Sequence, residues 1–461
     1  MRRAVLPVLP GRQERENDAG VGNGEPGPAI LRQDRGMDAP TLFSPADVGP
    51  MRLDHRVVMA PMTRIRADAA TLAPDDLTAH YYAQRASEGG LLISEAVHVS
   101  PEGTPTWKIY SRVNEVGGHV PGIWTQAQVA AWRNVTDAVH GRGGRIFCQL
   151  LHAGRVAQPE MGAHPLAQGW DAPPVSASAA AIQAAAEAGN HYNWDKDARP
   201  PRALETREIP RLTGDYVRAA QNAMEAGFDG VELHGAHGYL IEQFLNDGVN
   251  RREDAYGGSV ANRCRLLFGI VAALIQTVGE GRVSVRLSPT HPEPETGLSK
   301  QVYFGVSDSD PAALYTHAVA GLNDYPLAYL MLTEPRVGGL SEAAERETAF
   351  AHPLANIPYR AVYHGTLIGA GGFTPATARA AVAEGHYDLI AFGRWFISNP
   401  DLPARIRAGT PLTVYERRTF YGSGAEGYTD YPRTGEAPGR YRQMPQERIG
   451  ASLASARGER P

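Results

Sequence analysis

Cysteine is scarce in this sequence, because Cys148 and Cys264 are the only two among 461 residues. Two cysteines cannot form the disulfide framework of a small secreted domain, so we expect a cytoplasmic protein. Long apolar runs are also absent, and the longest one, Leu266 to Ile275, is too short to cross a bilayer. The net charge is −5 and no basic block stands out, so neither a nucleic acid nor a membrane is an expected partner.

Both ends of the chain lack hydrophobic periodicity. Residues 1–36 are rich in Gly, Pro, Arg and Glu, which predicts a disordered leader or a start codon assigned too early. Residues 434–461 are similarly polar, and we expect a frayed tail there. We expect residues 37–433 to fold as one domain, since the chain is 43% apolar and 21% charged, an ordinary soluble composition.

Short apolar segments alternate with amphipathic helical patterns through this middle part. The predicted strands cover residues 56–61, 90–94, 145–149, 230–233, 282–287, 327–332, 366–370 and 387–392. Helix starts are marked by a capping box at Thr125 and Gln128. A proline also follows a capping residue at Asp310, Thr374 and Asn399. Eight alternating units favour an α/β fold of the closed (β/α)8 TIM barrel type over the alternative, a doubly wound open sheet.

Active residues of such a barrel follow the carboxyl ends of the strands. Those positions hold Pro61, Met62, Thr63, Glu95, Ala96, Gln149, His152, His234, His237, Tyr239 and Arg286. Two connections, 99–121 and 155–207, are longer than a minimal barrel needs, and we expect them to extend over the same face.

Glycines follow the last two predicted strands, in Gly369-Ala-Gly-Gly-Phe373 and Gly393-Arg394. Glycine backbone at these two places is the usual phosphate cradle of the fold, and Arg394 adds a forked donor. The spacing in residues 369–373 lacks the third glycine of a dinucleotide fingerprint, so a plain tight turn is the alternative.

The segment Gly230–Tyr239 places two histidines and a tyrosine at the end of a buried strand. A metal site would need a third ligand, and Glu232 is expected to point differently. Two purely structural histidines are a second alternative. The favoured hypothesis is that His234 and His237 donate to one substrate oxygen. Tyr239, a neutral phenol with an ordinary pKa of about 10, would then give the proton.

Several longer motifs occur in a fixed order along the chain. They are Leu42–Pro45, Met59–Arg64, Gly230–Tyr239, Gln243–Gly258, Arg286–Pro289, Gly371–Phe373, Phe392–Arg394, Asn399–Leu402 and Phe420–Tyr431. Together they resemble the old yellow enzyme family over about Leu42 to Pro432. The chain has Thr63 where another branch of the family has cysteine, and in this it resembles the classical branch. His237 stands where many relatives have asparagine.

The resemblance implies a barrel that binds FMN non-covalently and reduces activated C=C bonds with NADPH or NADH by ping-pong kinetics. The implied substrates are electron-poor alkenes, namely α,β-unsaturated carbonyl or nitro compounds. We expect a monomer or a homodimer. The implied flavin contacts are Pro61, Met62, Thr63, Ala96, Gln149, Arg286, Gly371, Gly372, Gly393 and Arg394. The implied substrate contacts are His234 and His237 at the carbonyl oxygen, Tyr239 as proton donor, and Trp124 and Tyr421 as pocket walls.

Overall fold

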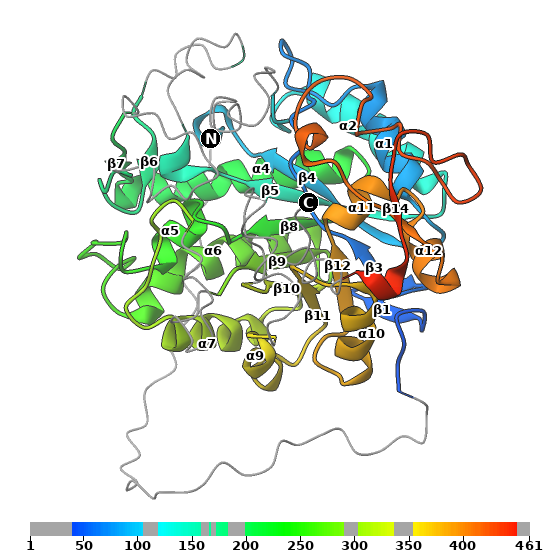
Figure 1. Ribbon diagram of the computed structural model, residues 1–461. Helices are drawn as coiled ribbons and strands as arrows, with labels where there is room; N and C mark the ends of the chain where they lie inside the picture. The colour runs from blue at the N-terminus through cyan, green and yellow to red at the C-terminus, as the bar shows by residue number, and fades with distance from the viewer. Residues whose placement is uncertain are drawn as a thin grey trace, which may run out of the picture. The chain divides into compact units, whose positions relative to one another are not determined.

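Eight parallel strands close into a barrel at the centre of the computed structural model (Figure 1). The structure describes residues 39–104, 119–157, 166, 172–182, 199–289, 303–335 and 354–449. The barrel strands are β3 (Val57–Met59), β4 (Leu91–His98), β5 (Arg145–Leu151), β8 (Gly230–His234), β9 (Val283–Leu287), β10 (Leu330–Thr333), β11 (Leu367–Ala370) and β12 (Leu389–Phe392). Each overlaps a predicted strand, and β12 pairs with β3 to close the sheet. The predicted TIM barrel is therefore confirmed, and the open sheet is excluded.

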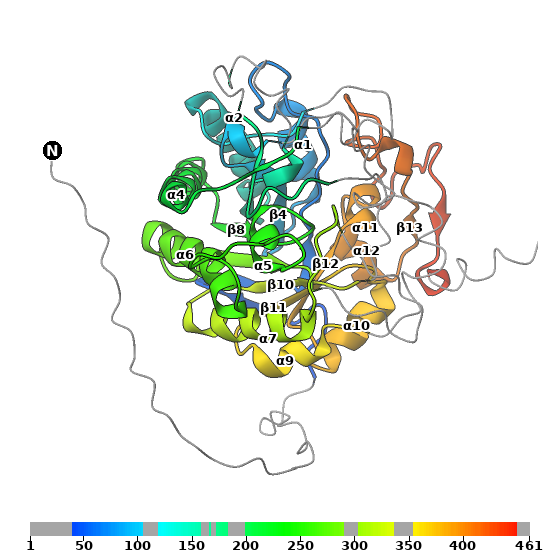
Figure 2. The same ribbon diagram turned by 90° about the vertical axis from the view of Figure 1, so that its left-hand side faces the viewer.

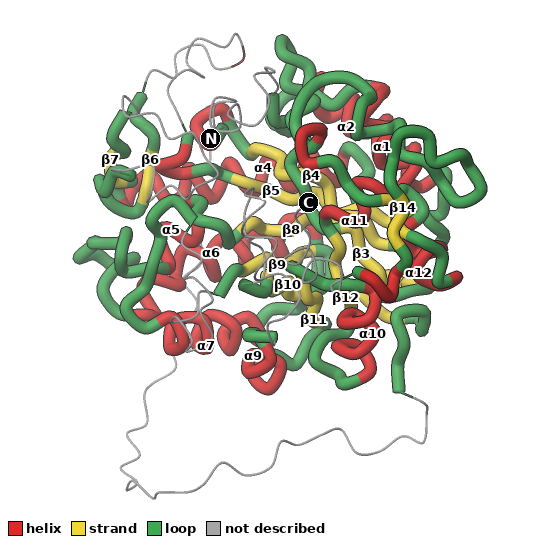
Figure 3. The backbone as a smooth tube through the Cα atoms, in the orientation of Figure 1, coloured by secondary structure: helices red, strands yellow, loops and turns green. Residues whose placement is uncertain are grey.

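Helices surround this sheet, and Figure 2 shows α4, α6, α7, α9 and α10 following one another around it. Figure 3 distinguishes the helices, in red, from the strands, in yellow. The helices are α1 (Asp76–Arg85), α2 (Gln126–His140), α4 (Ile209–Glu225), α5 (Leu240–Leu245), α6 (Val260–Val278), α7 (Pro311–Gly321), α9 (Ile357–Val362), α10 (Pro375–Ala383), α11 (Arg394–Ser398) and α12 (Leu402–Ala408). The capping box of Thr125 and Gln128 is confirmed, as are the caps at Asp310 and Thr374. Asn399 instead ends α11, and Asp401 precedes α12.

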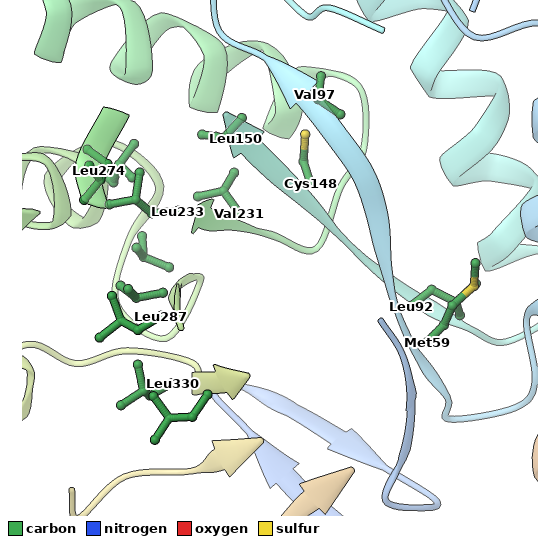
Figure 4. Packing of buried hydrophobic residues seen from close by; sticks show 14 of the residues in the cluster. Met59, Leu92, Val97, Cys148, Leu150, Val231, Leu233, Leu274, Leu287 and Leu330 are labelled. Atoms are coloured by element: carbon green, nitrogen blue, oxygen red, sulfur yellow. The ribbon is translucent and has the colours of Figure 1, made fainter. Parts of the chain in front are cut away.

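The apolar core has two layers because alternate strand residues face opposite sides of the sheet. Val57 and Met59 belong to the outer layer between strands and helices, whereas Val58 belongs to the barrel interior. Figure 4 shows the outer layer, where Leu233 of β8 and Leu274 of α6 lie in the same cluster. Burial on both faces explains why the strands are continuous apolar runs in the sequence.

Helix α6 is long and apolar enough to cross a membrane by length and composition alone. Its contacts are nevertheless those of a barrel helix, because it packs beside α4, α5 and α7. Arg263 on this helix donates to the carbonyl oxygen of Leu245 at 2.7 Å and pairs with Asp308 at 2.9 Å. The apolar character of α6 therefore serves packing against the strands.

A hairpin that the sequence analysis did not predict lies at the amino ends of the barrel strands. Its strands are β1 (Ala46–Val48) and β2 (Met51–Leu53), and they pair antiparallel. Ala46, Val48 and Leu53 are buried in the interior cluster with Val58. The hairpin thus closes the end of the barrel that is opposite the catalytic positions.

The expectation of a frayed tail from residue 434 is wrong for residues 434–449. Strand β14 (Gln443–Met444) pairs with β13 (Leu412–Thr413). Tyr441 is buried with its ring centroid 4.3 Å from that of Tyr431, and Ile449 is also buried. A few apolar anchors in a polar segment are enough to hold it, and composition averages conceal them.

His55 is a buried titratable group just before β3, far along the strands from the catalytic positions. Its Nδ1 accepts from the Val57 N–H at 3.3 Å, and its Nε2 lies 2.9 Å from Ser87 Oγ. Burial, and after it the charge of Arg407, lowers the pKa of His55 from 6.5 to about 4. The unfolded chain therefore binds a proton at this residue between pH 6.5 and 4 while the folded chain does not, so stability falls as the pH decreases through this window.

Replacing His55 with glutamine should make the protein less sensitive to acid, because glutamine keeps a donor for Ser87 and does not titrate. From pH 7 to pH 5 the parent should lose about 2 kcal/mol more unfolding free energy than His55→Gln. Urea unfolding at pH 8, 7 and 5 measures the difference, and the two proteins should change in parallel between pH 8 and 7. Equal losses at pH 5 would mean that His55 is protonated in the folded state.

Candidate active site

A pocket of about 270 Å³ lies at the carboxyl ends of the barrel strands. All implied flavin and substrate residues except Trp124 line it, namely Pro61, Met62, Thr63, Ala96, Gln149, His234, His237, Tyr239, Arg286, Gly371, Gly372, Gly393, Arg394 and Tyr421. These residues are more than 350 positions apart at the extremes of the sequence, from Pro61 to Tyr421. The closed barrel brings them together because all eight strands end on one face.

His234 is the last residue of β8 and is almost fully buried. Its Nδ1 accepts a hydrogen bond from the Ala236 N–H at 3.2 Å. Burial, and after it the charge of Arg286, holds the pKa of His234 well below 6.5. A neutral imidazole that accepts at Nδ1 carries its proton on Nε2, so His234 offers an N–H donor.

His237 follows in a turn with left-handed backbone, at a φ of 57°. Histidine and asparagine tolerate this conformation better than most residues, which explains why either of them suits this position. The backbone N–H of His237 donates to Ser288 Oγ at 2.9 Å. The ring centroid of His237 lies 5.2 Å from that of His234. Desolvation lowers the pKa of His237 well below its ordinary value, so this second imidazole is also neutral.

Tyr239 completes the same wall of the pocket. Its ring centroid lies 5.2 Å from that of His234, and 6% of the residue is exposed. It is the residue before α5, where its side chain makes no capping hydrogen bond. Two neutral donors and a phenol therefore line one cavity. Among the described residues no group of three or more His, Cys, Asp or Glu side chains could hold a metal ion.

Glycine backbone and the positive charge of Arg394 also line the pocket. Gly371 and Gly372 have φ angles of 101° and 67°, which are accessible mainly to glycine. Arg394 lines the cavity together with these glycines, and burial lowers the pKa of Arg394. Since desolvating a guanidinium costs free energy that a nearby anion offsets, this arrangement suits a phosphate group.

The polar floor of the pocket suits a flat heterocycle with several carbonyl groups. The Gln149 side-chain amide N–H donates to Glu232 Oε1 at 2.7 Å, so the Gln149 amide oxygen points away from Glu232. Arg286 Nε donates to Thr333 Oγ1 at 3.1 Å. Fixed donors and acceptors beside a phosphate cradle are the donor set that FMN requires, so these residues fit the implied cofactor.

Trp124, implied as a wall of the substrate pocket, is not among the residues that line this cavity. It is half-buried against Leu72 and Leu166. A Cβ at Gly122 would lie 2.0 Å from the Trp124 ring, so the glycine makes room for the indole in this packing position. Much of the 99–121 and 155–207 connections lies outside the described residues.

Two further residues that were expected just past a strand, Glu95 and His152, do not line the pocket, and Glu95 lies inside β4. Glu95 Oε2 accepts from the Arg64 N–H at 3.1 Å, and burial raises the pKa of Glu95 to about 7. His152 Nε2 lies 3.6 Å from Glu102 Oε2 inside a buried polar cluster. The sequence analysis selected them only because they follow a predicted strand. That position does not determine whether a side chain points into the pocket.

Several lining residues were not predicted from the sequence. They are Ala60, Tyr303, Thr333, Ala370, Phe373, Ala391, Phe392, Trp395, Ile397, Tyr415, Arg417 and Phe420. Tyr303 is the most informative, because its ring centroid lies 4.9 Å from that of His237. It belongs to a loop, where no periodic pattern marks a residue as a wall of a pocket.

Known proteins share this fold and much of this sequence. The model of the NADH:flavin oxidoreductase / NADH oxidase family matches residues 41–413. The 12-oxophytodienoate reductase 2 of Arabidopsis thaliana is 43% identical over 396 residues, covering 85% of this chain and 95% of that protein. The 12-oxophytodienoate reductase 7 of Oryza sativa subsp. japonica is 42% identical over 420 residues, or 88% and 98% of the two chains.

Solved structures agree with the sequence comparison. The old yellow enzyme homologue from Zymomonas mobilis superposes with a TM-score of 0.72 at 39% identity, covering 85% of this chain and 99% of that chain. Morphinone reductase in complex with tetrahydroNAD gives a TM-score of 0.71 at 38% identity, with 87% and 99% covered. The chain therefore belongs to the NADH:flavin oxidoreductase / NADH oxidase family, and within it is an old yellow enzyme, an FMN-dependent ene-reductase that uses NAD(P)H.

Proposed function

We propose that the substrates are α,β-unsaturated ketones, with nitroalkenes as a second group, whose oxygen is held by His234 and His237. The single observation that carries this proposal is the shared pocket of two neutral imidazoles and Tyr239. Two similar proteins are named for carbonyl compounds, 12-oxophytodienoate and morphinone, which supports the same substrate class.

The roles of the residues follow from where charge develops. FMN, when bound, supplies the hydride that NAD(P)H has delivered to it. As the substrate β-carbon is reduced, negative charge grows on the carbonyl oxygen, and the N–H groups of His234 and His237 stabilise it. Donors that are already in place act most strongly on the charged transition state. Tyr239 then gives its phenolic proton to the α-carbon and recovers one from solvent.

We also propose a cytoplasmic monomer or homodimer. Cys148 and Cys264 are free and buried, and burial raises the pKa of the Cys264 thiol to about 12. Protonated, buried thiols suit a reducing compartment. Gel filtration of the holoenzyme measures the oligomeric state.

The purified protein should be yellow and should show two separate colour changes. Under anaerobic conditions NADPH or NADH should bleach it, and 2-cyclohexen-1-one should restore the colour, because the two substrates use one pocket in turn. Stopped-flow absorbance of each half-reaction measures this. A series of enones, nitroalkenes and simple alkenes defines the substrate class. Bleaching followed by no recolouring with any enone or nitroalkene would refute the proposal, since the cofactor would be active without the proposed acceptor.

A further inference from the structure

A buried carboxylate stands directly behind the catalytic turn. Glu242, in the first turn of α5, is 3% exposed. Its Oε2 accepts from the Gly238 N–H, and its Oε1 accepts from the hydroxyls of Ser288 at 2.8 Å and Tyr315 at 2.7 Å. A carboxylate inside a protein is costly to bury unless several donors converge on it, and here three donors do so.

Ser288 extends this network to the catalytic histidine. Ser288 Oγ accepts from the backbone N–H of His237 at 2.9 Å, and the Ser288 hydroxyl donates to Glu242 Oε1 at 2.8 Å. The backbone N–H groups of His237 and Gly238 are therefore both fixed, one through Ser288 and one directly. These two residues have left-handed φ angles of 57° and 79°. A left-handed non-glycine residue is strained and persists only where its surroundings hold it.

The next helix residue binds the other side of the same turn. Gln243 donates from Nε2 to the Gly238 carbonyl oxygen at 2.8 Å and to that of Ala153 at 3.2 Å. A Cβ at Gly238 would lie 2.5 Å from the Tyr303 carbonyl oxygen, so the turn is also tightly enclosed. The turn that carries His237 and leads into Tyr239 thus has one orientation, and α5 sets it.

We propose that Glu242 is a positioning residue that aims the His237 imidazole at the substrate oxygen, acting through Ser288 and the Gly238 N–H. This inference rests on the proposed oxygen-holding role of His234 and His237. Glu242 does not line the pocket, so it acts on the ligand only through the turn. A displacement of about 1 Å in a catalytic group costs on the order of a hundredfold in rate, so a small change in the turn is measurable.

The test is Glu242→Gln in the FMN-loaded enzyme, with 4-chlorophenol as the probe ligand. Glutamine has one acceptor where glutamate has two, so either Gly238 N–H or Ser288 loses its partner and the turn shifts. We expect the dissociation constant for the phenolate to rise about tenfold, and its apparent bound pKa to rise by about one unit. Titration of flavin absorbance between pH 6 and 9 measures both. Loss of stability alone would not move the ligand's pKa.

Two further variants make the outcome decisive. Glu334→Gln is the matched control, because Glu334 is also buried and accepts from a tyrosine hydroxyl, that of Tyr387, and from the Ala355 N–H. It should bind the phenol like the parent. His237→Ala should weaken binding; if it does and Glu242→Gln does not, the positioning role is refuted while the proposed function stands.

Unchanged phenol binding in both His237→Ala and Glu242→Gln would refute the proposed function itself. If Glu242→Gln does not fold, Ser288→Ala carries the same test, because it removes the hydroxyl that links the His237 backbone N–H to Glu242. It should also weaken phenolate binding by about tenfold. Binding equal to that of the parent would overturn the inference.

Discussion

Replacing Tyr239 with phenylalanine should slow enone reduction by about 10²–10⁴-fold, the usual contribution of a positioned acid. The ring of Tyr239 would keep its packing against His234 and Phe304, whose centroids lie 5.2 and 5.8 Å away. Only the proton for the α-carbon would be missing. Bleaching by NADPH requires no proton from this residue and should stay close to the parent rate. Stopped-flow measurement of the two half-reactions separates the effects.

Nitroalkenes provide an internal control for this prediction. Their reduced form holds negative charge well on the nitro group, so it can leave the pocket and take its proton from water. Relative to the parent enzyme, Tyr239→Phe should therefore lose much less rate with a nitroalkene than with an enone of similar size. Equal losses in both half-reactions, or equal losses for both substrates, would assign Tyr239 a structural role in place of an acid role.

The barrel was predictable from sequence because the strands are buried on both faces and several helix starts carry their own signal. Thr125 with Gln128, and Asp310 before a proline, are local patterns that need no tertiary context. The pocket followed from one topological rule, that parallel strands of a barrel end on one face. The family motifs then supplied roles for individual residues, such as Arg394.

The features that were missed depend on contacts between distant segments. The β1–β2 hairpin is three residues per strand and resembles a loop, and only the apolar barrel end gives Val48 and Leu53 a place to be buried. Tyr441 looks like part of a polar tail until it meets Tyr431. Tyr303 enters the pocket because it packs on His237. Tyr303 and His237 are far apart in the sequence, and the other contacts join short segments without helical or strand periodicity, so no local pattern predicts them.

Replacing His234 with alanine should lower the rate of enone reduction by about 10²–10³-fold, because one preplaced donor contributes roughly 2.7–4 kcal/mol to an oxyanion-like transition state. It should also weaken binding of 4-chlorophenol, whose oxygen would occupy the same position. The loss has two possible sources in this structure. His234 offers Nε2–H to the pocket, and its Nδ1 accepts from the Ala236 N–H at 3.2 Å. Stopped-flow rates and flavin titration measure the size of both effects.

Two polar variants separate the donor from the acceptor role of His234. Glutamine can place an amide N–H near the position of imidazole Nε2, whereas the shorter asparagine reaches only the position of Nδ1, where its amide oxygen can accept from the Ala236 N–H. If the donor matters, His234→Gln should recover much of the enone rate and His234→Asn should be as slow as His234→Ala. The reverse order would mean that His234 serves to fix the Ala236 turn, and the substrate oxygen would then depend on His237 alone. Because both imidazoles are neutral, with pKa values well below 6.5, this ranking should be the same at pH 7 and pH 8.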